Sequence, residues 1–403
     1  MQTSAAVRRF AGLDHLRALA IIIVFVYHYN MFGHPAGLYD YLGSWGWTGV
    51  DLFFVLSGFL IGGQLFAKIA KDAKVSYGEF YFKRSLRILP AYFAVLALYI
   101  AIPGFKERSQ LPPLWRMFTF TQNFGLDLSK EGAFSHAWSL CIEEQFYLFL
   151  PLLIIGLSSI RAHKKAVWLI PALFLFGFAI RTYMWYDVIP HQESFGRAYY
   201  MYIYYPTWSR LDGLLAGVAL AAFYSKRPEA ASTDRSIIRD RTAIVWQKLT
   251  AKGNRIFFIA LALLAGAWFI AHDQHQYETR GAIFGYPAIA IGYGALVFAA
   301  LSPTCFLYKY SSRITRFIAV LSYSIYLTHK QLIHLTHEFL QPRGIDNDSY
   351  ASFWISTAVA LLGGWLLHLI VEKPFLRLRD RWLARRKNAK TPALQPAQPA
   401  TGA

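Results

Sequence analysis

The chain has 403 residues, of which 55% are hydrophobic and only 16% are charged, and its mean hydropathy is +0.31. This balance excludes an ordinary soluble domain and is typical of a polytopic membrane protein. Two cysteines exclude a disulfide framework, and the net charge of +18 has to be explained by where the basic residues fall.

The apolar segments predict an all-α protein with about ten transmembrane helices. Each is near the roughly 20 residues that a helix needs to cross a bilayer. In chain order they cover residues 15–32, 47–67, 86–103, 137–157, 166–186, 208–224, 255–272, 283–302, 316–337 and 351–371. The shorter segment Leu111–Phe124 is expected to be interfacial or re-entrant. We expect one membrane domain, 1–380, and a basic, then Pro- and Ala-rich disordered tail, 381–403.

The basic residues predict the orientation. With both termini in the cytoplasm, 30 of the 41 Lys and Arg residues fall in cytoplasmic segments and 7 in external ones. This asymmetry is the positive-inside pattern, so the charge sets the topology and no nucleic-acid partner is needed to explain it. A multi-pass protein of the inner (plasma) membrane is expected, with the first span acting as an uncleaved signal.

His28 is the most informative residue because it lies in an apolar run of the first span, Ala18–Met31. An ionisable group at such a position is costly in a bilayer and indicates function. Arg17 lies eleven residues earlier, so on a helix the two are within roughly 20° around the axis and about 16 Å apart along it. The alternative is a hydrogen-bonded packing histidine.

On the predicted topology, several spans bring ionisable side chains to the outer half of the membrane. We assign catalytic roles to His28, Glu143, Asp51 and Glu144, and acceptor-substrate binding to His329, Arg210, Asp212 and Tyr323. Glu143 or Asp51 is expected to orient His28 as a base. Glu143 and Glu144 point about 100° apart, so only one of them can face the centre. The alternative is that the acidic residues pair structurally with Arg181 or Arg210.

A second cluster lies at the cytoplasmic side, where Lys83, Arg84 and Arg87 begin the third span and Arg17 enters the first. Guanidinium groups bind phosphate through paired donors, so these residues are candidates for holding a phosphorylated donor. The alternative is that they only set the topology. Gly58 with Gly62 and Gly213 with Gly217 predict close helix packing. No zinc-ligand spacing is present, and no metal is expected.

With these residues assembled, the chain resembles the acyltransferase 3 family of integral membrane proteins. The resemblance covers roughly residues 10–380. It rests on the order and spacing of the motifs GLDHLRALAIIIVFVYH, GVDLFFVLSGFLI, YFKRSLRILPAYF, HAWSLCIEEQFYL, RLDGLLAG, LSYSIYLTH and VEKPF.

The resemblance implies an O-acyltransferase that moves an acyl group, commonly acetyl, from cytoplasmic acyl-CoA to a hydroxyl of a sugar, oligosaccharide or polysaccharide. The family's essential Arg-x10-His motif falls on Arg17 and His28, and its acyl-CoA-associated Arg-x-x-Arg falls on Arg84 and Arg87. Its acidic position falls on Glu143. Many relatives add a C-terminal esterase-like domain; this chain matches the standalone form, whose membrane spans alone would complete the reaction.

Two routes of transfer stay open: direct attack of the acceptor with His28 as general base, and an acyl-His28 intermediate. Two other classes of protein also stay open. A proton-coupled transporter or flippase of a glycan precursor would also carry charged clusters, although no inverted repeat is visible. An inactive, partner-binding relative would keep the motifs without the chemistry.

Overall fold

The structure is a computed structural model, and it describes residues 10–33, 37, 43–69, 76–108, 110–159, 168–225, 227, 241–271 and 278–390. These residues form helices joined by turns, and none of them lies in a strand. The predicted all-α class is therefore confirmed. Residues 391–403, most of the expected tail, lie outside the described part, whereas a basic helix, α17 (Lys373–Lys390), covers the start of that tail.

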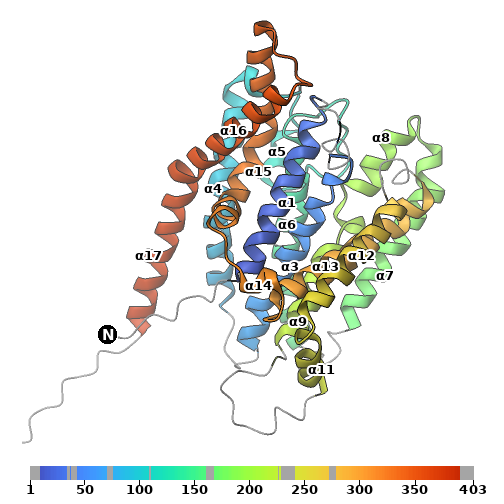
Figure 1. Ribbon diagram of the computed structural model, residues 1–403, viewed down its shortest axis with the longest axis vertical. Coiled ribbons are helices and arrows are strands. Elements are labelled where there is room, and N and C mark those ends of the chain that lie inside the picture. Colours follow the sequence, from blue (N-terminus) through green and yellow to red (C-terminus); the bar gives the residue numbers. More distant parts are fainter. Residues whose placement is uncertain are drawn as a thin grey trace, which may run out of the picture.

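Every expected span coincides with a helix. In chain order these helices are α1 (Ala11–Tyr29), α3 (Gly49–Ile69), α4 (Tyr77–Ala101), α6 (Trp138–Ser159), α7 (Leu169–Tyr183), α9 (Asp212–Ser225), α12 (Gly253–Ala271), α13 (Tyr286–Leu301), α15 (Arg313–Leu340) and α16 (Tyr350–Leu367). Figure 1 shows α1, α3, α6 and α15 at the centre of the bundle, α16 and α17 along one side, and α7, α12 and α13 along the other.

Among the described residues, seven helices are long and apolar enough to cross a membrane. The three other expected spans are occupied by α6, by α9, which is a shorter apolar helix, and by the more polar α15. Large apolar side chains are exposed on the outside of the bundle, among them Phe149, Phe258 and Trp354. This is the surface of a multi-pass membrane protein; the count of ten spans and the placement of the termini stay predictions.

Glycines let α3 and α9 pack with their backbones in close contact. A Cβ on Gly58 would meet the Leu214 backbone, and one on Gly217 would meet the backbone of Val55 and Phe59. Helices in a membrane gain stability mainly from such close packing, because lipid is as apolar as their side chains. The predicted role of the two glycine pairs in helix packing therefore fits the structure.

Two buried ion pairs tie α9 to its neighbours. Arg210 Nη2 lies 2.9 and 3.0 Å from the two carboxylate oxygens of Asp51 on α3. Arg181 on α7 binds Asp212 through distances of 2.7 and 3.1 Å. All four side chains are almost fully buried, where leaving any one charge alone would be very costly. The structural alternative, in which acidic residues pair with Arg181 or Arg210, therefore applies to Asp212 and Asp51.

Residues 102–108 and 110–137 form an irregular segment that packs against α4 and α6. It contains the short helix α5 (Leu114–Phe118), and its backbone carbonyls accept hydrogen bonds from those helices: Met117 O from Tyr92 and Phe120 O from Gln145. Non-helical backbone at membrane depth is tolerated only when it is satisfied by protein in this way. The arrangement fits the interfacial or re-entrant piece expected at Leu111–Phe124.

Candidate active site

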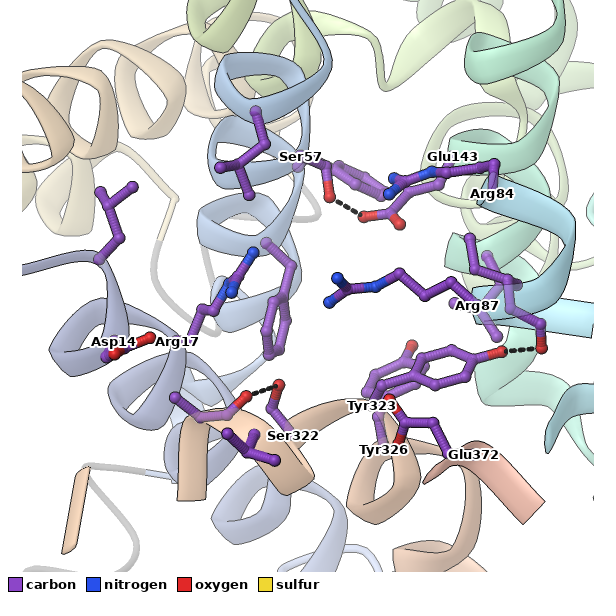
Figure 2. Close-up of a pocket in the computed structure, with 18 of the residues that line it drawn as sticks. Asp14, Arg17, Ser57, Arg84, Arg87, Glu143, Ser322, Tyr323, Tyr326 and Glu372 are labelled. Atoms are coloured by element: carbon purple, nitrogen blue, oxygen red, sulfur yellow. Dashed lines mark hydrogen bonds between the residues drawn. The ribbon is translucent and has the colours of Figure 1, made fainter. Parts of the chain in front are cut away.

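A cavity of about 520 Å³ lies between α1, α3, α4, α6 and α15. On the predicted topology it is at the cytoplasmic side, and we call it the inner cavity. Three guanidinium groups, those of Arg17, Arg84 and Arg87, line it and point into it from α1 and α4 (Figure 2). The structure thus brings together the arginines that the sequence placed in one donor-binding cluster.

These three arginines have no carboxylate within ion-pair distance in the part of the chain that the structure describes. The Arg84 guanidinium instead lies 3.7 Å above the centre of the Tyr147 ring. Lys83 differs, because it pairs with Glu79 at 2.5 Å and does not line the cavity. The expected donor-binding role therefore fits the three arginines and not the lysine.

Glu143 also lines the inner cavity. It accepts hydrogen bonds from Ser57 Oγ at 2.8 Å and from Tyr147 OH at 2.9 Å, and the first of these is drawn in Figure 2. Glu144 lines neither cavity and has one buried oxygen without a partner among the described residues. Glu143 therefore lies with the arginines and not with His28 as expected, because it is about one and a half helical turns further along α6 than Trp138, where that helix begins.

The far wall of the inner cavity comes from α15 and from a π-helical turn, η11 (His368–Glu372). Tyr323 lines this wall, and its hydroxyl donates to the Ile88 carbonyl at 2.8 Å. Glu372 accepts from Ser324 and from His368, both at 2.8 Å. Single π-helical turns recur at functional sites. Tyr323, expected to bind the acceptor, is in fact beside the arginines of the donor cluster.

A second, smaller cavity of about 140 Å³ lies beyond the first, and we call it the outer cavity. Val50 and Tyr326 line both cavities and so form the wall between them. Its lining is rich in aromatic side chains, three of them from another π-helical turn, η6 (Tyr200–Tyr204), and the residue after it: Tyr27, Phe32, Trp47, Trp138, Tyr200, Tyr204, Tyr205 and Tyr326. His28, His136 and Lys330 supply the polar groups together with Ser135 and Arg108.

Three imidazole rings form a cluster at this cavity. The ring centres of His28 and His329 are 4.8 Å apart, and that of His136 lies 6.2 Å from His28 and 5.3 Å from His329. All three rings are buried. No group of His, Cys, Asp or Glu among the described residues has an arrangement that could hold a metal ion. Two of the rings are joined by a hydrogen bond to each other, and each of these two also bonds a backbone carbonyl.

Those hydrogen bonds fix where the protons lie on the neutral rings. His329 Nδ1 is 2.9 Å from the Tyr326 carbonyl, which can only accept, so that nitrogen carries the proton and Nε2 carries a lone pair. His28 Nδ1 lies 3.1 Å from His329 Nε2 and 3.0 Å from the Val24 carbonyl. Facing two acceptors, it must be the protonated nitrogen. The remaining nitrogen of His28, Nε2, is then free to accept a proton.

The structure also corrects the expected partners of His28. Asp51 is held by Arg210, Glu143 belongs to the inner cavity, and His329, expected to bind substrate, is the group that orients His28. Asp51, Arg210 and Asp212 line neither cavity, so their contacts are those of packing residues. Asp51 and Asp212 pair with arginines because a buried charge is very costly unless an opposite charge lies beside it, and each arginine pairs with the carboxylate within its reach.

His136 and Tyr326 are among the residues of this site that were not assigned from the sequence. His136 opens the motif HAWSLCIEEQFYL, and its position just before α6 was the available signal. Tyr326 forms part of the wall between the cavities; its hydroxyl lies 2.7 Å from the His136 carbonyl and 2.6 Å from Ser139 Oγ. Nothing in its local sequence separates it from Tyr323, the other tyrosine of α15.

Fold and site together define a helical, multi-pass membrane protein with a basic cavity and a histidine cavity that share one wall. Comparison with protein families makes this more specific. The chain belongs to the acyltransferase 3 family, whose model, described as an acyltransferase domain, matches residues 10–369.

Among its curated relatives, a provisionally named O-acetyltransferase of Staphylococcus aureus is 25% identical over 382 residues, covering 91% of this chain and 57% of the relative. A provisionally named peptidoglycan O-acetyltransferase of Bacillus subtilis is 26% identical, with 94% and 57% covered. The peptidoglycan O-acetyltransferase OatA of Listeria monocytogenes is 28% identical, with 82% and 50% covered. The chain thus spans little more than half the length of these relatives. No solved structure is significantly similar to it.

Proposed function

We propose that this protein transfers an acyl group, acetyl by preference, from acyl-CoA to a hydroxyl of a sugar or glycan, with His28 as the general base. One observation carries the proposal. A cavity lined by three arginines, none of which has a described carboxylate within ion-pair distance, and a cavity lined by an oriented histidine share Val50 and Tyr326 as their wall. Donor binding and chemistry then take place at the two ends of one path along α1.

The inner cavity is the donor end of this path. Coenzyme A carries phosphates, and guanidinium groups bind phosphate oxygens through paired, charge-assisted hydrogen bonds. Arg17, Arg84 and Arg87 are directed into the cavity and have no described carboxylate at ion-pair distance, so their donors are available. With the phosphates there, the pantetheine arm reaches toward Tyr326 and presents the thioester to the outer cavity.

His28 performs the proton transfer in the outer cavity. Its Nε2 removes the proton of the acceptor hydroxyl while the oxygen attacks the thioester carbonyl carbon. The carbon–sulfur bond then breaks, and the CoA thiolate takes the proton back from the imidazolium, so that the base is restored. His329 Nε2 accepts from His28 Nδ1 throughout and stabilises the cation. An acyl-His28 intermediate is the competing route, in which Nε2 itself attacks the thioester.

A glycan acceptor is supported by the relatives and by the lining of the outer cavity. One relative is named a peptidoglycan O-acetyltransferase, and peptidoglycan is a polymer of sugars. Eight Phe, Tyr and Trp side chains line the outer cavity, and each has an apolar face that a sugar ring can contact.

The experiment is an assay of purified protein in detergent with acetyl-CoA labelled in the acetyl group and a soluble glycan fragment. The proposal predicts label on the glycan with wild type and at least about a hundredfold less with His28→Ala, since general-base catalysis contributes about 10²–10⁴. Label trapped on the protein after denaturation would favour the acyl-His28 route. Movement of an unmodified solute across vesicles, with no acyl transfer under any condition, would favour the transporter alternative.

A further inference from the structure

We infer that the acceptor carries an anionic group, a carboxylate or a phosphate, close to the hydroxyl that it offers, and that Arg108 and Lys330 bind this group. The inference deepens the proposed function and rests on it, because it concerns the outer cavity in which His28 acts. It adds the charge of the acceptor, which neither the family nor the names of the relatives specify.

The charges that line the outer cavity have one sign. Arg108 and Lys330 line it together with His28 and His136, and no Asp or Glu of the described chain is among the lining residues. A neutral sugar carries no charge that two fixed cations could balance. An anion between them would be bound by charge-assisted hydrogen bonds. Both cations line one small cavity, and like charges so placed repel each other, a cost that a bound anion would offset.

One carboxylate lies behind this lining, and its oxygens are already occupied. Glu107 is buried and takes hydrogen bonds from the Phe134 amide at 3.1 Å and from Tyr99 at 2.7 Å. Lys330 Nζ lies 3.3 Å from its Oε1 and 2.9 Å from Ser135 Oγ. An ammonium has three donors, so Lys330 keeps one N–H for the cavity. One carboxylate therefore balances one of the two cations.

Arg108 is the cation left over. No carboxylate of the described residues lies within ion-pair distance of it. Its side chain runs across Gly132, where a Cβ would collide with it, so the absence of a side chain at this glycine leaves room for Arg108 beside the cavity. The positive-inside rule accounts for basic residues in cytoplasmic segments, and it does not account for Arg108, which lies on the side predicted to be external. The same segment carries Arg116, which stacks on Trp115 and lines neither cavity, and which therefore serves as a matched control.

The test is a binding measurement on the full-length purified protein. Calorimetry compares the disaccharide of N-acetylglucosamine and N-acetylmuramic acid, whose carboxylate is free, with its methyl ester, which has the same hydroxyls and no charge. A second arm compares N-acetylglucosamine 6-phosphate with N-acetylglucosamine. Wild type is expected to bind the charged member of at least one pair about tenfold more tightly, and the pair that shows the preference identifies the group as carboxylate or phosphate.

Arg108→Gln is expected to bring the two dissociation constants of that pair together, whereas Arg116→Gln leaves their ratio as in wild type. Arg108 is exposed, so its replacement does not disturb the fold. Equal binding of charged and neutral members in both pairs, or a preference that survives Arg108→Gln, overturns the inference. A charge preference without any transfer of labelled acetyl to a glycan would support the anionic site and count against the proposed function instead.

Discussion

His28 carries its Nδ1 proton between two acceptors, the Val24 carbonyl and His329 Nε2, and this leaves Nε2 as a base. His28 itself is visible in the sequence because an ionisable group in an apolar run has few explanations. The group that orients it is not visible, because His329 is 301 positions away along the chain. A carboxylate was the expected partner, and the structure uses a second imidazole.

Replacing His329 tests this orienting role. His329→Ala should lower kcat by about a hundredfold with little change in the KM for the acceptor, since a misplaced catalytic group costs that much without affecting binding. His329→Gln, which can still accept from His28 Nδ1, should recover part of the rate. The measurement is steady-state acetyl transfer, with His334→Ala on the same helix as the control. A raised acceptor KM with unchanged kcat would return His329 to the substrate-binding role first expected.

The donor arginines make a separate prediction. Arg87→Gln should raise the KM for acetyl-CoA by about tenfold, because a charge-assisted hydrogen bond contributes about 1.5–3 kcal/mol. Lys83→Gln removes an equal charge four positions earlier, where the side chain pairs with Glu79 and stays outside the cavity. It should leave the KM near the wild-type value. Similar effects of the two variants would mean that overall basic charge, and not the inner cavity, attracts the donor.

At the scale of elements, the packing of α3 against α9 fixes where the walls of both cavities stand. Val50 and Ser57, which line the inner cavity, lie on the helix whose Gly58 touches the Leu214 backbone. The glycine spacing predicts this close approach from the sequence. It does not predict that Asp51 on the same helix reaches Arg210, since several carboxylates and arginines were compatible with the same depth.

Gly217→Ala should reduce the free energy of unfolding by about 1–3 kcal/mol, because its new methyl group meets backbone atoms that have no rotamer to escape into. Gly63→Ala adds the same group where nothing lies within 4 Å and should be neutral or slightly stabilising. Unfolding in detergent, followed by circular dichroism, compares the two. Equal free energies of unfolding for the two variants would show that α3 and α9 can move apart at little cost to make room for the methyl group.

Tyr326 makes the wall between the cavities, and its hydroxyl is held by His136 and Ser139. Tyr326→Ala should widen the passage and raise the turnover of butyryl-CoA relative to acetyl-CoA. Tyr326→Phe keeps the ring and should keep the preference for acetyl. Turnover ratios with the two donors are the measurement. An unchanged ratio in the alanine variant would place the limit on acyl length elsewhere.

For the molecule as a whole, hydropathy and charge asymmetry were enough to predict an all-α membrane protein and the positions of its long apolar helices, but not helices such as α17 (Lys373–Lys390). They were also enough to separate Arg17, Arg84 and Arg87 from His28 by depth. Hydropathy and charge asymmetry could not predict which buried charges pair. Helix packing, and not sequence spacing, brings Arg181 to Asp212 and Arg210 to Asp51. Depth alone likewise placed Glu143 beside His28, whereas the structure places it with the arginines.

The central claim is that the donor enters at the arginine cavity and the acceptor is modified beyond Tyr326, on the opposite side of the membrane. Sealed vesicles of known orientation test it, with labelled acetyl-CoA added on one side and a soluble glycan enclosed on the other. We predict labelled glycan only when acetyl-CoA is on the side of Arg17, Arg84 and Arg87, and none with His28→Ala. Transfer only when donor and acceptor share one side would contradict the claim.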